Sequence, residues 1–425
     1  MTPRPLHAVL LPPAEAGGRL LTALEAALDG TGPAILPLDP ALPEPRLAAL
    51  LDAFAPSHLD SGQGPERLTT PSSAAQPTAG VGPDTAVVIA TSGSTGQPKG
   101  AELSAGALLA SARASLRRVG ARPGERWLCC LPAFHIAGIQ VLVRSLLAGA
   151  APAVVTGRLD PGVLAASGCA HVAVVPTQLR RLVDAGADLA ALSTILLGGA
   201  AVPPGLLDDA RAAGGRVVTT YGMSETSGGC VYDGMPLDDV SVDIGQDGRI
   251  RIAGPVLFSG YRLRPDLTAQ ALDGRWFVTS DLGSLGPSGE LVVRGRADDV
   301  INTGGEKVVA AEVEAALGAC AGVRDAAVVG CPDPEWGELV TAVVVPADPE
   351  APPSLPEIRA ELRGRLPVSA VPAALLLVQE VPLLPSGKPD REALRARAAE
   401  AVRQDPPTRR WAHDTTAGTF GHAER

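Results

Sequence analysis

Lysine is scarce in this chain of 425 residues. Only three of its 36 basic residues are lysines, namely Lys99, Lys307 and Lys388. A codon bias toward arginine removes lysine wherever arginine serves equally well. A lysine that remains is therefore a candidate for a site that needs a compact ammonium group on a flexible stem. All three lie inside glycine-rich segments, a grouping that chance survival on the surface does not predict.

Other features are also rare or missing. Aromatic residues make up 3% of the sequence, and the 46% hydrophobic content comes mainly from alanine, valine and leucine, as in an α/β protein with buried parallel strands. No apolar run reaches the roughly 18 to 20 residues of a membrane span, and the start of the chain lacks the apolar region of a signal peptide. We therefore expect a cytoplasmic protein. The net charge of −10 argues against nucleic acid as a partner, because phosphate binding needs a basic face.

The six cysteines show neither the density of a disulfide framework nor paired C-x-x-C spacing. We expect buried free thiols and no structural metal.

Strand and helix patterns divide the chain into two parts. Apolar strands separated by helix-like segments favour a largely parallel, helix-covered sheet; they lie at residues 127–131, 151–155, 171–175, 193–197 and 216–220. Shorter, crowded strands after about Ile250 predict a more antiparallel or barrel-like piece. Beyond Lys307 the pattern changes to helix, two strands, helix and strand. The predicted fold is therefore α/β, with a large N-terminal domain of helix-covered sheets plus the barrel-like piece (1–297), a small C-terminal α+β domain on a hinge (298–400) and a disordered tail (401–425).

A loop rich in glycine and hydroxyl side chains follows the apolar strand 86–90. Residues 91–100 read TSGSTGQPKG, and Ser104 is a plausible N-cap for the helix expected next. A loop between strand and helix that offers hydroxyls, backbone N–H groups and one cation can hold phosphates. It is not a Walker P-loop, because Lys99 stands between proline and glycine. The expected phosphate-binding residues are Thr91, Ser92, Gly93, Ser94, Thr95, Gly96 and Lys99.

This loop resembles that of the adenylate-forming superfamily, which contains acyl-CoA ligases, firefly-type luciferases and adenylation domains. Further segments resemble the motifs of that superfamily in the expected order. Residues 221–226 (YGMSET) are similar to its adenine and Mg²⁺ motif, 276–282 (WFVTSDL) to its ribose segment, 295–307 (GRADDVINTGGEK) to its hinge, and 385–388 (PSGK) to its catalytic lysine motif. The resemblance covers roughly residues 85–395 and implies ATP, Mg²⁺ and coenzyme A as cofactors and co-substrates.

The resemblance also implies roles for single residues. An acyl-adenylate forms when a carboxylate attacks the α-phosphorus of ATP and pyrophosphate leaves, so catalysis is mainly positioning and neutralisation of charge. Glu225 would hold Mg²⁺, Asp281 would accept hydrogen bonds from the ribose, and Lys388 would bridge the carboxylate and the α-phosphate. The other residues assigned to ATP are Gly199, Ala200, Ala201, Tyr221, Gly222, Met223, Ser224 and Arg296.

Two chemical steps need two arrangements of one active site, because the lysine that assists adenylation must make way for a thiol. In the superfamily the small domain rotates about a hinge, and Asp298 matches the hinge position. Gly304, Gly305 and Lys307 would then line the coenzyme A tunnel.

The acyl substrate is indicated by residues 131–146. The stretch LPAFHIAG resembles the superfamily's acyl-pocket segment, which implies that His135 borders and gates the acyl site. Arg144 interrupts the apolar helix that follows, so it must either snorkel to water or pair with a buried anion. Together with residues 198–201 and 221–234, this region resembles the o-succinylbenzoate:CoA ligases of menaquinone biosynthesis, whose substrate is an aromatic dicarboxylate. The resemblance implies that Arg144 holds the benzoate carboxylate.

In the same interpretation Gly228 and Gly229 leave room for the aromatic ring. The partners implied are a small carboxylic acid, ATP and coenzyme A, and a homodimer is left open.

Three alternatives stay open. A medium-chain or aryl acyl-CoA ligase predicts an apolar residue in place of Arg144. An adenylation domain that loads a carrier protein predicts an early pocket carboxylate for an α-ammonium group, and no strong candidate stands there. A non-catalytic nucleotide-binding relative predicts loss of Lys388 or Glu225, and both are present.

Overall fold

The computed structural model describes residues 3–68, 80–92, 98–382 and 389–404. The chain divides into two compact units, Met1–Arg294 and Gly295–Arg425. Of the predicted site, residues 93–97 of the phosphate loop and Lys388 lie outside the described residues. No helix among the described residues is long and apolar enough to cross a membrane.

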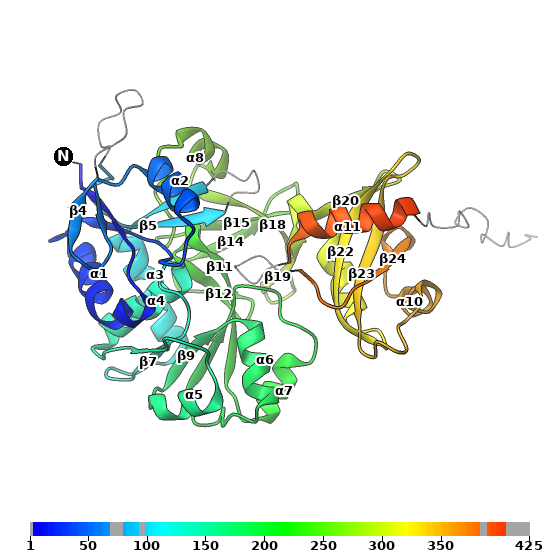
Figure 1. Cartoon of the computed structure of the whole chain (residues 1–425), viewed down its shortest axis with the longest axis horizontal. Coiled ribbons are helices and arrows are strands. Elements are labelled where there is room, and N and C mark those ends of the chain that lie inside the picture. Colours follow the sequence, from blue (N-terminus) through cyan, green and yellow to red (C-terminus); the bar gives the residue numbers. More distant parts are fainter. Residues whose placement is uncertain (1–2, 69–79, 93–97, 383–388, 405–425) are drawn as a thin grey trace, which may run out of the picture. The chain divides into compact units, whose positions relative to one another are not determined.

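The first sheet of unit 1 has seven strands in the order β16-β6-β5-β2-β1-β3-β4 (Figure 1). Four of them run parallel: β1 (Leu6–Val9), β2 (Ala34–Pro37), β3 (His58–Asp60) and β5 (Thr85–Ser92). Three pair antiparallel to their neighbours: β4 (Pro65–Arg67), β6 (Pro98–Ser104) and β16 (Gly260–Tyr261).

The second sheet also has seven strands, in the order β13-β12-β11-β10-β9-β7-β8. Its parallel core contains all five strands that the apolar runs predict: β7 (Trp127–Cys129), β8 (Ala153–Val154), β9 (His171–Val174), β10 (Thr194–Leu197) and β11 (Val217–Met223). Two antiparallel strands follow: β12 (Gly228–Tyr232) and β13 (Met235–Pro236). The predicted helix-covered parallel sheet is thus confirmed.

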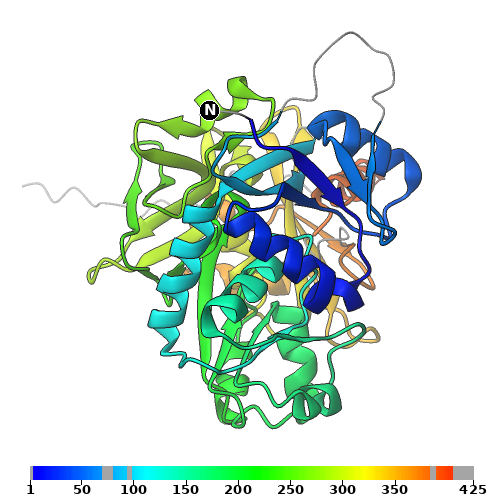
Figure 2. The same ribbon diagram turned by 90° about the vertical axis from the view of Figure 1, so that its left-hand side faces the viewer.

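Helices α3 and α4 lie between these two sheets, and Figure 2 shows them from the side. Ser104 caps α3 as expected, because its Oγ accepts a hydrogen bond from the backbone N–H of Ala107. The helices of unit 1 are α1 (Leu21–Leu28), α2 (Glu44–Phe54), α3 (Ala105–Val119), α4 (Ile136–Ala148), α5 (Pro161–Ser167), α6 (Pro176–Asp184), α7 (Leu206–Ala212) and α8 (Pro265–Ala271).

The crowded strands after Ile250 form an antiparallel sheet with the open order β14-β15-β18-β17, and β19 pairs with β18. Its members are β14 (Ser241–Ile244), β15 (Arg249–Ala253), β17 (Leu272–Asp273), β18 (Trp276–Leu285) and β19 (Leu291–Arg296).

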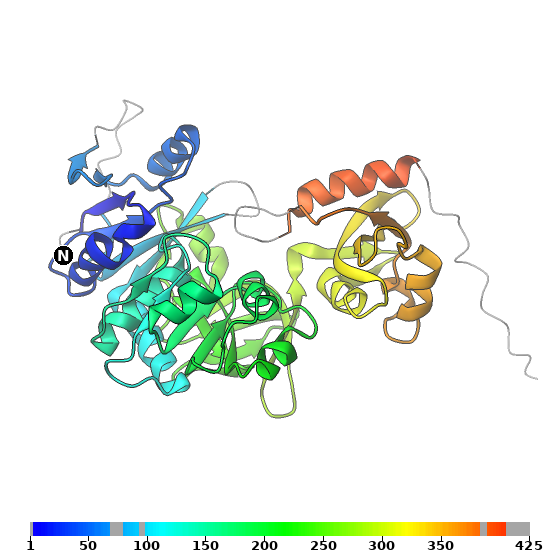
Figure 3. The ribbon, with the colours of Figure 1, turned by 60° about the horizontal axis from the view of Figure 1, so that its bottom comes forward.

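Unit 2 is the α+β domain that the sequence predicts, and α11 lies along its sheet (Figure 3). Its strands are β20 (Val300–Thr303), β21 (Glu306–Val309), β22 (Val323–Asp333), β23 (Gly337–Pro346) and β24 (Ala374–Leu377). Its helices are α9 (Ala310–Leu317), α10 (Leu355–Leu362) and α11 (Arg391–Gln404).

Two expectations need correction. The phosphate loop joins strand β5 to strand β6, not a strand to a helix, because residues 98–104 pair antiparallel with β5 before α3 begins. Ala101 and Leu103 are two positions apart and both buried, so they face the same side of the sheet. This fixes the register of the strand. Residues 401–404, assigned to the tail, continue helix α11.

Candidate active site

The predicted nucleotide-binding segments of unit 1 gather where parallel strands of the second sheet end. Gly199, Ala200 and Ala201 follow the carboxyl end of β10, and residues 221–223 form the carboxyl end of the neighbouring strand β11. Gly199 takes a φ of +85°, which glycine adopts at little cost. In open α/β sheets ligands bind outside the carboxyl ends of the strands. This edge is therefore a plausible nucleotide site on topology alone.

A hydrogen bond joins the predicted adenine and ribose motifs. Tyr221 Oη donates to Asp281 Oδ2 at 2.7 Å, although the two residues are 60 positions apart. Asp281 is fixed further, because its backbone N–H donates to Thr279 Oγ1 at 3.0 Å. Burial, and then the neighbouring Asp281 carboxylate, raise the pKa of Tyr221. Tyr221 therefore keeps its proton and remains a donor to Asp281.

Glu225 and Lys99 both contact Tyr261, a residue that the sequence did not single out. Tyr261 Oη donates to Glu225 Oε1 at 2.8 Å, and Lys99 Nζ lies 5.4 Å from the centre of the Tyr261 ring. Strand β16 carries Tyr261 and pairs with β6, which places it opposite Ala101. Burial, and then the Glu225 carboxylate, raise the pKa of Tyr261. Tyr261 thus contacts both the lysine of the phosphate loop and the predicted Mg²⁺ ligand.

Thr91 stands at the described start of the phosphate loop. It pairs with Lys99 in the β5–β6 ladder, and its Oγ1 donates to the backbone carbonyl of Lys99 at 3.2 Å. This hydrogen bond links Thr91, the first hydroxyl residue of the loop, to Lys99, its only lysine.

The residues near Glu225 are compatible with one bound Mg²⁺. The described residues contain no group of three or more histidine, cysteine, aspartate or glutamate side chains arranged to hold a metal ion. Mg²⁺ at phosphate sites takes one or two carboxylates, with waters and substrate phosphates completing its shell. Glu225, oriented by Tyr261, matches this requirement.

The glycines near Glu225 lie where neighbouring strands and a helix approach closely. A Cβ at Gly222 would lie 2.1 Å from the carbonyl oxygen of Gly228. A Cβ at Gly228 would lie 3.2 Å from Cγ of Gln140, and one at Gly229 would lie 3.0 Å from the Tyr232 ring. The Cβ positions at Gly228 and Gly229 are thus occupied by atoms of α4 and β12, so these glycines allow β11, β12 and α4 to approach one another. Their place beside the acyl group stays a prediction.

His135 stands directly before helix α4, at the carboxyl side of β7. It is the N-cap residue of α4, its side chain is exposed, and its ring centroid lies 4.7 Å from that of Phe134. Its position at the edge where β10 and β11 also end is compatible with a place at the mouth of an acyl site.

Arg144 is buried, which excludes the snorkelling alternative. Only 5% of the residue is exposed, and its guanidinium carbon lies 4.5 Å from the centre of the Trp127 ring. Its Nη1 is 3.5 Å from Ser115 Oγ, while its Nε has no hydrogen-bond partner. No carboxylate among the described residues forms an ion pair with it. A buried cation without an anion is costly; a substrate carboxylate as the partner of Arg144 stays a prediction.

The position of Arg144 along α4 sets its depth. It follows His135 by nine residues, which corresponds to about 13.5 Å along a helix axis at 1.5 Å per residue. The Cα–Cβ bonds of a helix tilt toward its N-terminus, which shortens this separation at the side chain. Its neighbour Trp127 begins β7, so Arg144 lies toward the amino end of that strand, whereas His135 stands beyond its carboxyl end.

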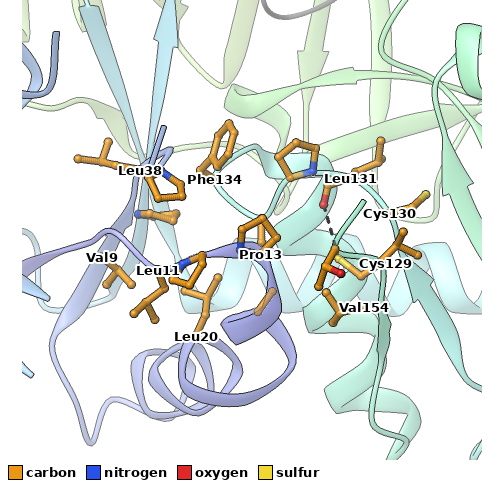
Figure 4. Close-up of a pocket in the computed structure, with 18 of the residues that line it drawn as sticks. Val9, Leu11, Pro13, Leu20, Leu38, Cys129, Cys130, Leu131, Phe134 and Val154 are labelled. Atoms are coloured by element: carbon orange, nitrogen blue, oxygen red, sulfur yellow. Dashed lines mark hydrogen bonds between the residues drawn. The ribbon is translucent and has the colours of Figure 1, made fainter. Parts of the chain in front are cut away.

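A pocket of about 200 Å³ opens beside Phe134 (Figure 4). It lies where strands of both seven-stranded sheets end, namely β1, β2, β7 and β8. Its lining is mainly apolar and includes Val9, Leu11, Leu20, Leu38, Cys129, Leu131 and Val154. Leu131, Pro132, Ala133 and Phe134 of the predicted acyl-pocket segment line it, whereas His135, Arg144 and the residues predicted for ATP do not.

All six cysteines are free thiols, as the sequence predicts. Five are buried and Cys130 is half-buried. Burial raises the pKa of Cys129 to about 11 and that of Cys130 to about 12. Both groups therefore stay protonated near neutral pH.

The predicted hinge and coenzyme A residues lie in unit 2. Arg296 Nη2 pairs with Asp298 Oδ2 at 3.1 Å, and both side chains are about half exposed. Gly304 and Gly305 form the turn between β20 and β21 with φ values of +58° and +84°. Lys307 is exposed on β21. The backbone N–H of Gly304 donates to the Trp336 carbonyl at 2.8 Å, which ties this turn to the start of β23.

Comparison with known proteins identifies the family. The family model described as AMP-binding enzyme matches residues 32–262, and the model described as AMP-binding enzyme C-terminal domain matches residues 312–388. The chain belongs to the AMP-binding enzyme family. This confirms the resemblance to adenylate-forming enzymes.

Relatives within the AMP-binding family include CoA ligases. The chain is 42% identical to a probable 2-succinylbenzoate–CoA ligase of Mycobacterium tuberculosis, over 93% of this chain and 99% of the relative. It is 35% identical to a feruloyl-CoA synthase of an Amycolatopsis species, over 72% of this chain and 68% of that protein.

A solved AMP-binding enzyme has a similar structure over most of the chain. This is the o-succinylbenzoate CoA synthetase (MenE) of Bacillus subtilis in complex with its acyl-adenylate intermediate OSB-AMP, with a TM-score of 0.79, 27% identity and coverage of 92% of this chain and 88% of that one. The same enzyme has been solved with ATP and a magnesium ion (TM-score 0.77, 26% identity, coverage of 92% and 89%). The predicted fold class is therefore confirmed.

Proposed function

We propose that this protein is an AMP-forming ligase that converts o-succinylbenzoate to its CoA thioester, as in menaquinone biosynthesis. The likeness to a 2-succinylbenzoate–CoA ligase over nearly the full length of both proteins carries this proposal. The buried Arg144, which lacks a carboxylate partner among the described residues, supplies a physical reason for a substrate with a second carboxylate.

The first step joins the acid to ATP. The succinyl carboxylate attacks the α-phosphorus, pyrophosphate leaves, and an acyl-adenylate forms. Tyr221 holds Asp281 so that its carboxylate accepts hydrogen bonds from the ribose. Lys99 neutralises phosphate charge, and Thr91, bonded to the Lys99 carbonyl, supports the base of the phosphate loop. Bound Mg²⁺, held by Glu225, supplies further charge neutralisation on the phosphates. Gly199, Ala200, Ala201 and residues 222–224 complete the proposed nucleotide site at the strand ends.

The second step transfers the acyl group to the thiol of coenzyme A, and AMP leaves. In the proposed cycle Lys388 serves the first step, Asp298 is the hinge, and the 304–307 turn serves the second step. Arg296 is proposed to contact the nucleotide, and His135 to gate the acyl site. A cytoplasmic location and a homodimer stay predictions.

Pyrophosphate release with ATP and a panel of acids tests the substrate. We expect o-succinylbenzoate to give the highest kcat/KM among o-succinylbenzoate, benzoate, ferulate and octanoate. Activity on benzoate or octanoate without activity on o-succinylbenzoate would refute the proposal. Preference for ferulate would favour the aryl acyl-CoA alternative, which the feruloyl-CoA synthase relative keeps open.

The lysine assignment has its own test. Lys388→Ala should abolish adenylation and still convert supplied acyl-adenylate to the thioester. Equal loss of both half-reactions would contradict the assignment of Lys388 to the first step.

A further inference from the structure

Unit 2 contains a buried ion-pair network around Arg391. Arg391 Nε pairs with Asp299 Oδ2 at 2.9 Å, and its Nη1 and Nη2 form a fork on the two oxygens of Glu314 at 2.9 and 3.1 Å. Nη1 also donates to the Val328 carbonyl at 2.8 Å. Only 20% of the Arg391 side chain, 17% of Asp299 and 19% of Glu314 are exposed. Solvent therefore screens this network less than an ordinary surface pair.

The network connects two segments that matter for the proposed cycle. Asp299 immediately follows Asp298, the proposed hinge residue, in the short helix Ala297–Asp299. Arg391 begins helix α11 and stands three residues after Lys388. The backbone N–H of Asp390 donates to the Pro382 carbonyl at 2.8 Å. The two ends of the segment that carries Lys388 are thus held together, and Arg391 fixes one of them to the residue after the hinge.

A contribution to the stability of helix α11 does not explain why an arginine stands at position 391. A cation in the first turn of a helix opposes the helix dipole, which favours anions there. An arginine fork with three acceptors also restricts geometry far more than a hydrophobic residue would. The arginine at this position therefore specifies the mutual placement of Asp299, α9, β22 and α11.

We propose that Arg391 is a positioning residue for the adenylation step, which acts by fixing the Lys388 segment to the unit 2 side of the hinge through Asp299 and Glu314. This inference rests on the proposed function only in taking Asp298 as the hinge and Lys388 as the adenylation lysine. Because Asp299 is held within unit 2, the proposed rotation takes place before Asp299, and Arg391 moves with unit 2.

Separate half-reactions test the proposal. Adenylation is followed by pyrophosphate exchange with the acid that the wild type uses best, and thioester formation is followed with supplied acyl-adenylate and coenzyme A. Arg391→Gln should lower kcat for adenylation by about 10- to 100-fold, because a misplacement of about 1 Å costs up to about 10²-fold. KM for ATP and the thioester half-reaction should stay close to the wild-type values.

Two further variants keep the test decisive if Arg391→Gln does not fold. Asp299→Asn preserves the shape of the side chain and removes its charge, so it should cause the same selective loss. The double variant Asp299→Asn with Arg391→Gln should be no worse than Arg391→Gln alone, since both act on one contact. Arg403→Gln is the matched control, because Arg403 is on the same helix, is 71% exposed and pairs with Glu400 instead of Asp299; it should leave both half-reactions unchanged.

An equal loss in both half-reactions, additive losses in the double variant, or unchanged adenylation would overturn the proposal. The outcome is independent of the substrate assignment. If the wild type adenylates another acid, o-succinylbenzoate is excluded as the substrate, while the comparison of half-reactions still tests Arg391.

Discussion

Tyr221 Oη and Asp281 Oδ2 lie 2.7 Å apart and join the two halves of the proposed nucleoside site. Without the phenol hydroxyl, the Asp281 carboxylate loses a donor that orients it toward the ribose. Tyr221→Phe should therefore raise KM for ATP about 10-fold or more, since a hydrogen bond to a charged group is worth about 1.5–3 kcal/mol.

Steady-state kinetics with varied ATP measures this effect. Tyr232→Phe is the control, because Tyr232 Oη is buried against Ser115 Oγ at 2.7 Å and contacts none of the nucleotide residues. An unchanged KM for ATP in Tyr221→Phe would show that the contact does not serve nucleotide binding.

The contact between Tyr261 and Glu225 predicts a change in Mg²⁺ dependence. Tyr261→Phe removes the donor at 2.8 Å from Glu225 Oε1. Loss of a group that orients a metal ligand typically costs about 10- to 100-fold in metal affinity, so half-maximal activity should require correspondingly more Mg²⁺. The Mg²⁺ concentration for half-maximal activity should rise further in Glu225→Gln. A Mg²⁺ titration at saturating ATP distinguishes the variants, and identical curves for Tyr261→Phe and the wild type would disprove the role of Tyr261.

Arg144 predicts a selective loss on one substrate. Arg144→Met replaces the buried cation by an apolar side chain, so a buried substrate carboxylate loses its partner at a cost of about 2–5 kcal/mol. We expect kcat/KM for o-succinylbenzoate to fall by at least about 30-fold. Activity on 4-oxo-4-phenylbutanoate, which lacks the ring carboxylate, should not fall.

Thermal unfolding is the control for Arg144→Met. Replacing a buried charge by an apolar residue of similar size is often neutral or stabilising, so the variant should remain folded. Equal losses on both acids would assign Arg144 to structure and not to substrate recognition.

Glu125 predicts a pH dependence of stability. It accepts hydrogen bonds from the backbone N–H of Arg122 at 2.7 Å and from Arg122 Nε at 2.8 Å, and His171 Nε2 lies 3.0 Å away. The backbone N–H of Arg122 is the largest cause that lowers the pKa of Glu125, to about 2, with further lowering from His171 and the Arg122 side chain. A carboxyl group with a depressed pKa stabilises the folded state above its ordinary pKa and loses this contribution as the pH falls.

Glu125→Gln should therefore be less stable than the wild type at pH 7. The difference between the two should shrink as the pH falls from 4.5 toward 2, because the wild-type carboxylate becomes protonated in that window. Chemical denaturation at several pH values measures it. A difference that stays constant between pH 7 and pH 2 would contradict this role of the Glu125 charge.

Local sequence patterns were sufficient for much of the fold. The five apolar runs of the second sheet, the cap at Ser104 and the helices and strands of unit 2 depend on side-chain periodicity within short windows. Strand β6 was missed because its seven residues stand between a glycine-rich loop and the start of a helix. Only the pairing with β5 shows that buried and less buried side chains alternate along it. Tyr261 was missed because a two-residue strand brings it to Lys99 from far along the chain, and no local signal marks such a pairing.

The sequence by itself determined the candidate reacting groups, since a lysine retained in a glycine-rich segment and a carboxylate inside a specific motif are chemical facts of the chain. Tertiary structure alone decided what surrounds Arg144, Gly228 and Arg391. Whether an arginine snorkels or is buried, and whether a glycine opens a pocket or admits a neighbouring strand, depends on which distant atoms surround it. Those neighbours come from segments tens to hundreds of residues away, so only the folded chain specifies them.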